Sequence, residues 1–130
     1  MIPENVKKVF EENTWFIATC GDELNVVPVG FKCITEDGNF AVGAVLLETT
    51  LNNVRANGKV AIAACGAGAE SYQVKGTACL VTEGPVFDFF AKLAEDTFKG
   101  AMSAKCALIV KPEKLIVASP NGQNKQELPL

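Results

Sequence analysis

The chain has 130 residues, of which 48% are hydrophobic and 21% charged, and its formal net charge is −3. This length and composition predict one globular domain, residues 1–130, and exclude disordered and fibrous architectures. The acidic balance disfavours nucleic acids and anionic membranes as partners, because both attract basic surfaces. The sequence contains no histidine, which excludes Ser-His and Cys-His catalysis and every metal site that relies on imidazole.

Five cysteines are spread along the chain without a C-x-x-C pair. Their odd number and wide spacing argue against a disulfide framework or a zinc cluster. The first residues contain no apolar signal-peptide core, and no segment approaches the roughly 18 apolar residues of a membrane-spanning helix. We therefore expect a cytoplasmic protein. Four cysteines lie in apolar runs and are expected to be buried and reduced: Cys20, Cys65, Cys79 and Cys106.

Apolar side chains recur at helical spacing in residues 3–13, which predicts a short amphipathic helix. β-Branched and aromatic runs separated by turn residues then predict strands over residues 14–20, 24–34 and 39–47. An Asp-Gly pair lies between the last two runs, so these two strands are expected to pair antiparallel through a tight hairpin.

The sequence then changes period, and residues 48–59 predict one or two helical turns that end at Gly58. Two strands follow, over residues 59–65 and 71–83, and Gly76 marks a bulge or bend in the second. The GAGAE segment between them is rich in glycine. It is either a flexible hairpin loop or a lid that moves over a bound ring.

Residues 85–99 carry apolar side chains on one helical face and predict the longest helix, ended by Gly100. Two strand-like runs, residues 106–110 and 114–118, come next, and the polar tail 119–130 is expected to be ordered only against a partner. Six or seven short strands without repeated βαβ units predict a mainly β fold, an antiparallel β-barrel with flanking helices.

Thr49 and Thr50 stand at the start of the short helix expected within residues 48–59. Two hydroxyl groups, unpaired backbone N–H groups and the positive end of a helix together suit a phosphate dianion. Arg55 and Lys59 would add positive charge nearby. An isolated Thr-Thr pair is more often a simple helix cap, so the residues alone leave both interpretations open.

The chain also resembles a known family, over residues 3–118. Five segments carry the resemblance by their order and spacing: VVPVGF at 26–31, EDGN at 36–39, ETTLNNVRANGKVAIA at 48–63, VKGTA at 74–78 and TEGP at 82–85. They resemble the pyridoxamine 5'-phosphate oxidase-like, FMN-binding split-barrel superfamily, and within it the small FMN-binding proteins most closely. This resemblance implies a six-stranded split barrel that forms a homodimer, with one FMN per subunit in a groove at the interface.

In such a protein, Val27, Pro28 and Val29 would run past the isoalloxazine ring and offer backbone contacts to its edge. The alternative is a plain apolar strand, although Pro28 fits best where its missing N–H faces a ligand or an open sheet edge. Lys75 lies on the strand where relatives carry a basic or polar residue that reaches the cofactor. An exposed strand position without a ligand is its alternative.

The family's phosphate-binding segment usually reads Lys-Thr followed by Asn three positions on, and the equivalent residues here are Thr49, Thr50 and Asn53. Thr49 thus replaces the expected lysine. The resemblance therefore implies weaker FMN affinity, or a positive charge that comes from Lys75 or from the two basic residues after Asn53.

Pyridoxamine-phosphate oxidases proper are longer and hold their substrate with arginine and histidine near the C-terminus. The tail of this chain has neither residue type, so that reaction is not expected. Glu48 and Tyr72 are the only placed candidates for a general acid or base, and both are more often structural. The cofactor would therefore perform the chemistry.

We expect an FMN-binding flavoprotein, with two functions open: a small FMN-dependent oxidoreductase that takes electrons from a reduced nicotinamide or a protein donor, or a non-enzymatic electron carrier or flavin store. A haem-binding or cofactor-free relative is disfavoured, because no histidine is present to bind iron. Residues 24–34, 39–47 and 106–110 hold more apolar side chains than the inside of a small barrel needs, which predicts a symmetric homodimer.

Overall fold

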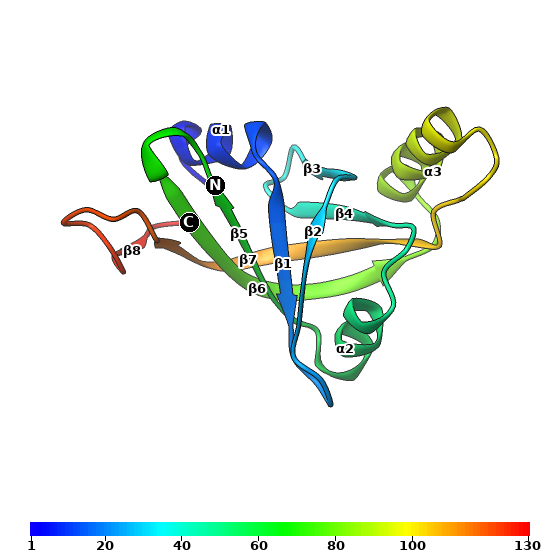
Figure 1. Ribbon diagram of the computed structural model, residues 1–130, viewed down its shortest axis with the longest axis horizontal. Helices are drawn as coiled ribbons and strands as arrows, with labels where there is room; N and C mark the ends of the chain where they lie inside the picture. Colours follow the sequence, from blue (N-terminus) through cyan, green and yellow to red (C-terminus); the bar gives the residue numbers. More distant parts are fainter.

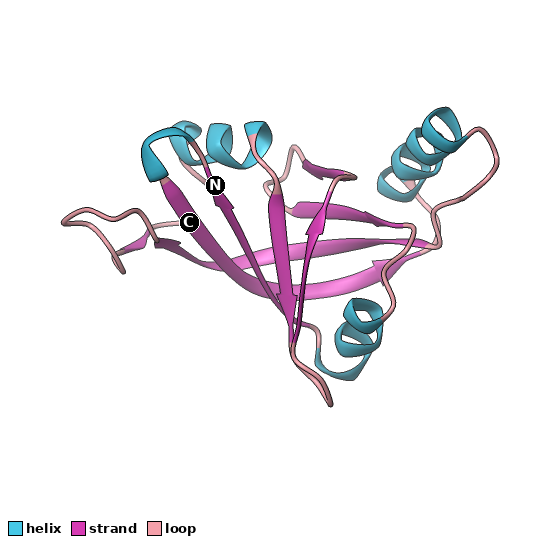
Figure 2. Ribbon diagram, viewed as in Figure 1, coloured by secondary structure: helices cyan, strands magenta, loops and turns pink.

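The computed structural model describes residues 1–130 and shows a curled antiparallel sheet with three α-helices (Figure 1). The helices lie at the ends and along one side of the sheet (Figure 2). The predicted mainly β split barrel is confirmed, with eight strands rather than six or seven. The strands are β1 (Trp15–Thr19), β2 (Asn25–Val29), β3 (Lys32–Ile34), β4 (Phe40–Ala44), β5 (Lys59–Cys65), β6 (Ser71–Val81), β7 (Cys106–Val117) and β8 (Glu127–Leu128). The helices are α1 (Glu4–Glu12), α2 (Thr49–Asn57) and α3 (Pro85–Phe98), and a 3-10 turn, η1, covers Ala67–Ala69.

The strand order is β2-β1-β5-β6-β7-β4-β3, and β8 pairs with the C-terminal part of β7. β2 and β3 follow each other in the chain, yet they are the two edge strands of the sheet. Gly30 and Phe31 alone connect them, so the sheet curls round without hydrogen bonds between its two edges. The barrel is therefore split along β2, whose outer edge carries unpaired backbone groups.

The single strand expected over residues 24–34 is two strands with different partners. β2 pairs with β1, whereas β3 pairs with β4. An apolar run does not show where a strand changes partner, because both strands present similar residues to the core. The predicted Asp-Gly hairpin is confirmed between β3 and β4, and Gly38 in this turn has a φ of 85°.

The two strands expected over residues 106–110 and 114–118 are one continuous strand, β7. Pro112 is accommodated within it because it lies opposite Gly76, where the register between β6 and β7 shifts. The predicted bulge at Gly76 is thereby confirmed. A Cβ atom on Gly76 would overlap the carbonyl oxygen of Lys111, so the close approach of the two strands requires glycine.

The main core fills the inside of the curled sheet, and α1 closes one end of it. The rings of Phe10 and Phe40 lie 4.9 Å apart between centroids, and Trp15 packs 5.1 Å from Phe40. The indole Nε1 of Trp15 donates a hydrogen bond of 2.6 Å to the Phe10 carbonyl oxygen, which satisfies a buried polar group. The predicted amphipathic helix therefore docks through the apolar face that its spacing indicated.

α3 covers the outer side of β4 and β7 and forms a second small core there. Phe90 packs against Ala41 and Ala107, and a Cβ atom on Gly43 would lie 2.7 Å from the Phe90 ring. Residues 39–47 and 106–110 hold more apolar side chains than the inside of the barrel needs. Most of these side chains are buried within the chain, because α3 packs on the outer side of the two strands. Leu46 in the first of these segments is exposed, and other large exposed apolar side chains lie elsewhere: Phe16, Leu24, Val26 and Phe89.

The prediction of four buried cysteines was wrong for three of them. Cys106 is buried, whereas Cys65 and Cys79 are exposed and Cys20 is half-buried. Strand alternation turns Cys65 and Cys79 toward the outer side of the sheet. An apolar run therefore indicated the strand but not the face on which each cysteine lies.

The tail is ordered against its own chain rather than against a partner. Leu128 pairs with Leu115, and the buried Ser119 hydroxyl accepts from the Ser71 N–H at 2.9 Å and donates to the Ser71 carbonyl oxygen at 3.1 Å. α2 has nine residues, more than the one or two turns predicted, and ends at Gly58 with a φ of 71° as expected. None of the helices is both long and apolar enough to cross a membrane.

Candidate functional site

β2 provides the open edge on which the predicted cofactor strand depends. Val27, Pro28 and Val29 all lie on this edge strand, and Pro28 thus occupies the kind of position that its missing N–H predicts. Val29 is buried, Val27 packs against the core, and Pro28 is exposed. The free backbone of β2, rather than the two valine side chains, is therefore what this edge presents to a ligand.

An apolar groove of about 260 Å³ begins at this edge and is called the edge groove below. Its walls are the end of β2, the segment between β4 and α2, and the end of α3. Two of the predicted cofactor residues line it, and the chain enters α2 directly after its far wall. The lining residues are Pro28, Val29, Gly30, Phe31, Gly43, Val45, Leu46, Leu47 and Phe98.

The first turns of α2 carry the three predicted phosphate residues, two of which have internal partners. The buried Thr50 hydroxyl accepts a hydrogen bond from Asn25 Nδ2 at 3.0 Å. The buried Asn53 amide donates to the Thr19 hydroxyl at 3.0 Å and to the Glu23 carbonyl oxygen at 2.9 Å. Both side chains therefore fasten α2 to the β1–β2 hairpin, a role that the sequence motif did not reveal.

The Thr49 side chain, in contrast, makes no hydrogen bond to the hairpin. It is half-buried at the start of α2, and no side chain caps the first N–H groups of the helix. These amide groups have no partners within the helix, and the helix end adds a partial positive charge. Asp22 and Glu23 share a polar hollow of about 320 Å³ with Thr49, and their carboxylates disfavour an anion in that hollow.

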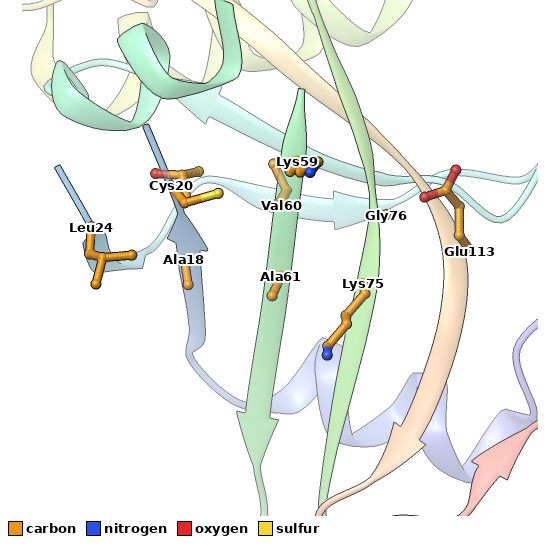
Figure 3. A pocket seen from close by; sticks show the side chains of 10 residues that line it. Ala18, Cys20, Leu24, Lys59, Val60, Ala61, Lys75, Gly76 and Glu113 are labelled. Carbon is orange, nitrogen blue, oxygen red and sulfur yellow. The ribbon is translucent and has the colours of Figure 1, made fainter. Parts of the chain in front are cut away.

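The structure does not bring the predicted replacement cations to Thr49. Arg55 lies in the last turn of α2, about 9 Å along the helix axis from Thr49. Lys59 follows the end of that helix at the start of β5. Lys75 lies on the outer side of β6, in a separate groove of about 460 Å³ (Figure 3).

Lys105 is a cation near this region that sequence analysis missed. Its backbone N–H donates to the Ala44 carbonyl oxygen at 2.7 Å, at the end of β4 where the far wall of the edge groove begins. No motif marks this residue, because only the pairing of β4 with β7 brings two distant segments together.

Neither Tyr72 nor Glu48, the two candidates for a general acid or base, lines the edge groove. Tyr72 donates a hydrogen bond of 2.6 Å to the Glu70 carboxylate, and Asn5 Nδ2 lies 3.4 Å from the Tyr72 oxygen. Burial, together with the Glu70 carboxylate, raises the pKa of Tyr72 to about 12. Glu48 is the exposed N-cap residue of α2 and makes no capping hydrogen bond.

The GAGAE loop lies at the end of β5 remote from α2. Figure 1 shows η1 beside α1, and a Cβ atom on Gly66 would lie 3.1 Å from the Asn13 side chain. Gly68 and Ala69 have φ values of 67° and 62°, so the loop is a tight turn in a defined conformation. The structure therefore favours the hairpin-loop interpretation over a lid on the edge groove.

Residues 2–120 match the family model described as Pyridoxamine 5'-phosphate oxidase. The chain belongs to this family. The match extends from before α1 to beyond β7, so the edge groove and the start of α2 lie inside the part that the family shares. No curated protein matches the chain.

Solved structures with the pyridoxamine 5'-phosphate oxidase fold confirm the split barrel. HupZ of Group A Streptococcus is 24% identical, with a TM-score of 0.79 over 95% of this chain and 98% of that chain. An FMN-binding protein from Syntrophomonas wolfei subsp. wolfei is 17% identical, with a TM-score of 0.76 over 91% and 86%. An F420 reductase is 18% identical, with a TM-score of 0.64 over 88% and 98%. At these identities the likeness shows the fold.

Proposed function

We propose that the chain is an FMN-binding flavoprotein and a small FMN-dependent oxidoreductase whose electron donor is a reduced nicotinamide or a protein. The observation that carries this proposal is the apolar edge groove, which lies between the free edge of β2 and the segment that leads into the uncapped start of α2. Membership of a flavin-binding family and the similarity to an FMN-binding protein support it. The cytoplasm, where free cysteines persist, is its proposed location.

The residues fit FMN at two neighbouring places, the edge groove and the start of α2. The backbone of Val27, Pro28 and Val29 offers polar groups to the edge of a ring, and the apolar lining suits its faces. The first N–H groups of α2 and the Thr49 and Thr50 hydroxyls suit the phosphate, because the Thr50 hydroxyl accepts one hydrogen bond and still has a proton to donate.

Two of the predicted residues take other roles in this proposal. Asn53 positions the helix start through its bonds to the β1–β2 hairpin. Lys75 is left out of the cofactor contacts, because its side chain lies on the outer side of the sheet in the other groove.

A homodimer is part of the proposal. The edge groove holds about 260 Å³, which is less than the roughly 300–1,000 Å³ of a typical ligand site, so a second subunit would complete it. Phe16 and Val26 are 49% and 63% exposed on the outer side of β1 and β2. Pro28 lies opposite Phe16 on the same side, and this apolar face suits a symmetric contact.

A bound flavin would supply hydride and single-electron chemistry, and the chain would position it and exclude water from one ring face. The alternative is a non-enzymatic electron carrier or flavin store. It is favoured by the absence of an acid or base from the lining of the groove, since Tyr72 is bonded to Glu70 and Glu48 does not line it.

Titration of the apoprotein with FMN tests the cofactor. We expect saturable quenching of flavin fluorescence at micromolar concentrations, and Thr50→Val should weaken binding far more than the matched change Thr14→Val at an exposed position. The melting temperature of each variant shows whether it is folded. Absence of saturable quenching, or tighter binding of F420 than of FMN, would overturn the FMN assignment.

Anaerobic stopped-flow mixing of the FMN-loaded protein with NADH or NADPH separates the two functions. Bleaching of the oxidised flavin band within a turnover time supports the oxidoreductase. If neither nicotinamide reduces the flavin while dithionite reduces it in two one-electron stages, the carrier function replaces it. Pyridoxamine 5'-phosphate is the negative control, since the chain contains no histidine to hold it.

A further inference from the structure

A polar pocket of about 420 Å³ lies at the end of the barrel that α1 closes, and it is called the end pocket below. Its walls are α1, the GAGAE loop, the start of β6 and the tail that follows β7. Figure 1 shows these segments at the end of the sheet remote from α2. No residue that lines the edge groove lines this pocket, and neither Phe16 nor Val26 of the exposed apolar face does. The end pocket is therefore a separate cavity.

The Glu70 carboxylate is the only charged side chain that lines the end pocket. Glu70 is half-buried and makes no ion pair, because the one ion pair of the molecule lies on α3. A carboxylate that is partly removed from water and has no cation beside it costs free energy. A positively charged ligand in the pocket would offset this cost.

The Tyr72 hydroxyl holds one of the two carboxylate oxygens. Tyr72 is 6% exposed and donates to Glu70 Oε2 at 2.6 Å, whereas no hydrogen bond reaches Oε1. Oε1 is therefore left for the donor of a ligand. An ammonium group suits a single free oxygen, because it is a compact charge with three donors. A guanidinium group suits it less well, because its planar fork pairs with both oxygens of a carboxylate.

Neutral amide side chains supply the rest of the polar lining, from Asn5, Asn121 and Gln123. The Asn121 side chain fixes the turn of the tail, because its Oδ1 accepts from the Gln123 backbone N–H at 2.9 Å. The Gln123 side chain is exposed and makes no hydrogen bond within the chain. Carboxamide groups both donate and accept, so they match hydroxyl groups, which do the same. The pocket thus combines one anionic point with several neutral polar groups.

We propose that the end pocket binds a small primary amine that carries several hydroxyl groups, as an amino sugar does. The ammonium group would bond to the Glu70 carboxylate, and the hydroxyl groups would bond to the amides of Gln123 and Asn121. The volume of the pocket falls within the range of small-molecule sites, roughly 300–1,000 Å³. This inference does not rest on the proposed flavin site, which lies at the edge groove and the start of α2.

Calorimetric titration with glucosamine tests the inference, at a pH where its amine is protonated. Glucose lacks the ammonium group, and ethanolamine keeps it but has only one hydroxyl group. We expect one saturable site per chain for glucosamine and at least tenfold weaker binding of each of the other two. Glucose that binds as tightly would overturn the role of charge, and ethanolamine that binds as tightly would overturn the role of the hydroxyl groups. Absence of saturable binding at millimolar glucosamine would overturn the site.

The variant Glu70→Gln should lower the affinity for glucosamine at least tenfold, because a hydrogen bond to a charged group is lost. The control Glu83→Gln makes the same change in net charge at an exposed position outside the pocket and should leave the affinity unchanged. The melting temperature of each variant shows whether it is folded. Equal affinities of the two variants would overturn the pairing of the amine with Glu70.

The variant Gln123→Ala tests the amide side of the pocket without removing a hydrogen bond of the fold. It should lower the affinity for glucosamine about fivefold, because a neutral hydrogen bond is lost. Gln126→Ala is the matched control, since Gln126 lies in the same tail but does not line the pocket. Equal affinities of these two variants would overturn the contact with Gln123.

A titration with FMN present separates the end pocket from the proposed cofactor site. Protein saturated with FMN should bind glucosamine with unchanged affinity, and glucosamine should not restore flavin fluorescence. Displacement of FMN by glucosamine would show one shared site and overturn the inference. Failure of FMN to bind, with glucosamine binding intact, would overturn only the proposed function.

Discussion

At the start of α2, Thr49 occupies the position where the family resemblance expects lysine. Its side chain makes no hydrogen bond, and Arg55, Lys59 and Lys75 all lie away from it. The site therefore offers hydroxyl and amide hydrogen-bond donors to a phosphate group, but no full positive charge. Substitution of Thr49 therefore tests whether a positive charge at this position is needed for FMN binding.

Thr49→Lys should raise FMN affinity about tenfold, because one charge-assisted hydrogen bond contributes about 1.5 kcal/mol. The control Thr14→Lys adds the same charge at an exposed position near α1. Fluorescence titration of both variants measures the effect. Equal FMN affinities of the two variants would place the phosphate away from the start of α2.

Tyr72 is the only tyrosine of the chain, so its ionisation can be followed directly by absorbance near 295 nm. Burial and the bonded Glu70 carboxylate raise its pKa to about 12. We expect the folded protein to titrate near that value and the unfolded protein near the ordinary value of about 10. Glu70→Gln should lower the pKa but leave it above 10, because burial is the larger cause.

The raised pKa has a defined consequence for stability. A folded-state pKa above the unfolded value means that the stabilisation is complete below about pH 10 and is lost as pH rises toward 12. Tyr72→Phe should therefore flatten the fall in the free energy of unfolding across this window. A wild-type tyrosine that titrates at pH 10 in the folded state would contradict the buried Tyr72–Glu70 pair.

At the scale of the elements, the bulge between β6 and β7 sets the register of the longest ladder in the sheet. Gly76 makes it possible, because any side chain there meets the carbonyl oxygen of Lys111. The same bulge accommodates Pro112 and turns Lys114 toward Lys75. One glycine thus determines both the continuity of β7 and the pairing of Lys114 with Lys75.

Gly76→Ala should lower the free energy of unfolding by about 1–3 kcal/mol, because the strands must separate to admit the methyl group. Gly122→Ala in the tail is the matched control, since a Cβ atom there meets no atom within 4 Å, and it should change stability by less than about 0.5 kcal/mol. Urea denaturation measures both. Similar stabilities of the two variants would show that the ladder does not require the close approach.

At the scale of the whole molecule, the curled sheet separates two outer faces. α3 covers the face over β4 and β7, whereas the face over β1 and β2 exposes Phe16 and Val26. The uncovered face continues across Ala18 and Ala61 to Lys75. The uncovered face is therefore the surface on which we expect the dimer contact.

Light scattering at low concentration checks the assembly. We expect twice the chain mass for the wild type and a single chain mass for Val26→Lys, because a buried lysine without a partner opposes the contact. Phe89→Lys on α3 also replaces an exposed apolar residue and should leave the dimer intact. A wild-type monomer that binds FMN tightly would contradict a cofactor groove completed by the second subunit.

The sequence by itself determined the mainly β class, the three helices, the hairpin at Gly38, the helix end at Gly58 and the bulge at Gly76. These features depend on local periodicity and on glycine conformations, which short segments encode. The sequence also indicated the family, because the order and spacing of the motifs can be read from the sequence alone. The site residues could be placed only as far as their local element: Thr49 and Thr50 were correctly expected at the start of a helix.

The tertiary structure decided what no local pattern contains. It divided residues 24–34 between two edges of the sheet, covered one outer face with α3, and engaged Thr50 and Asn53 in bonds to a hairpin about 30 residues away. It also moved Lys75 to a groove of its own. The physical reason is that strand partners, faces and side-chain bonds depend on residues far apart in the chain, and a sequence pattern reports only neighbours.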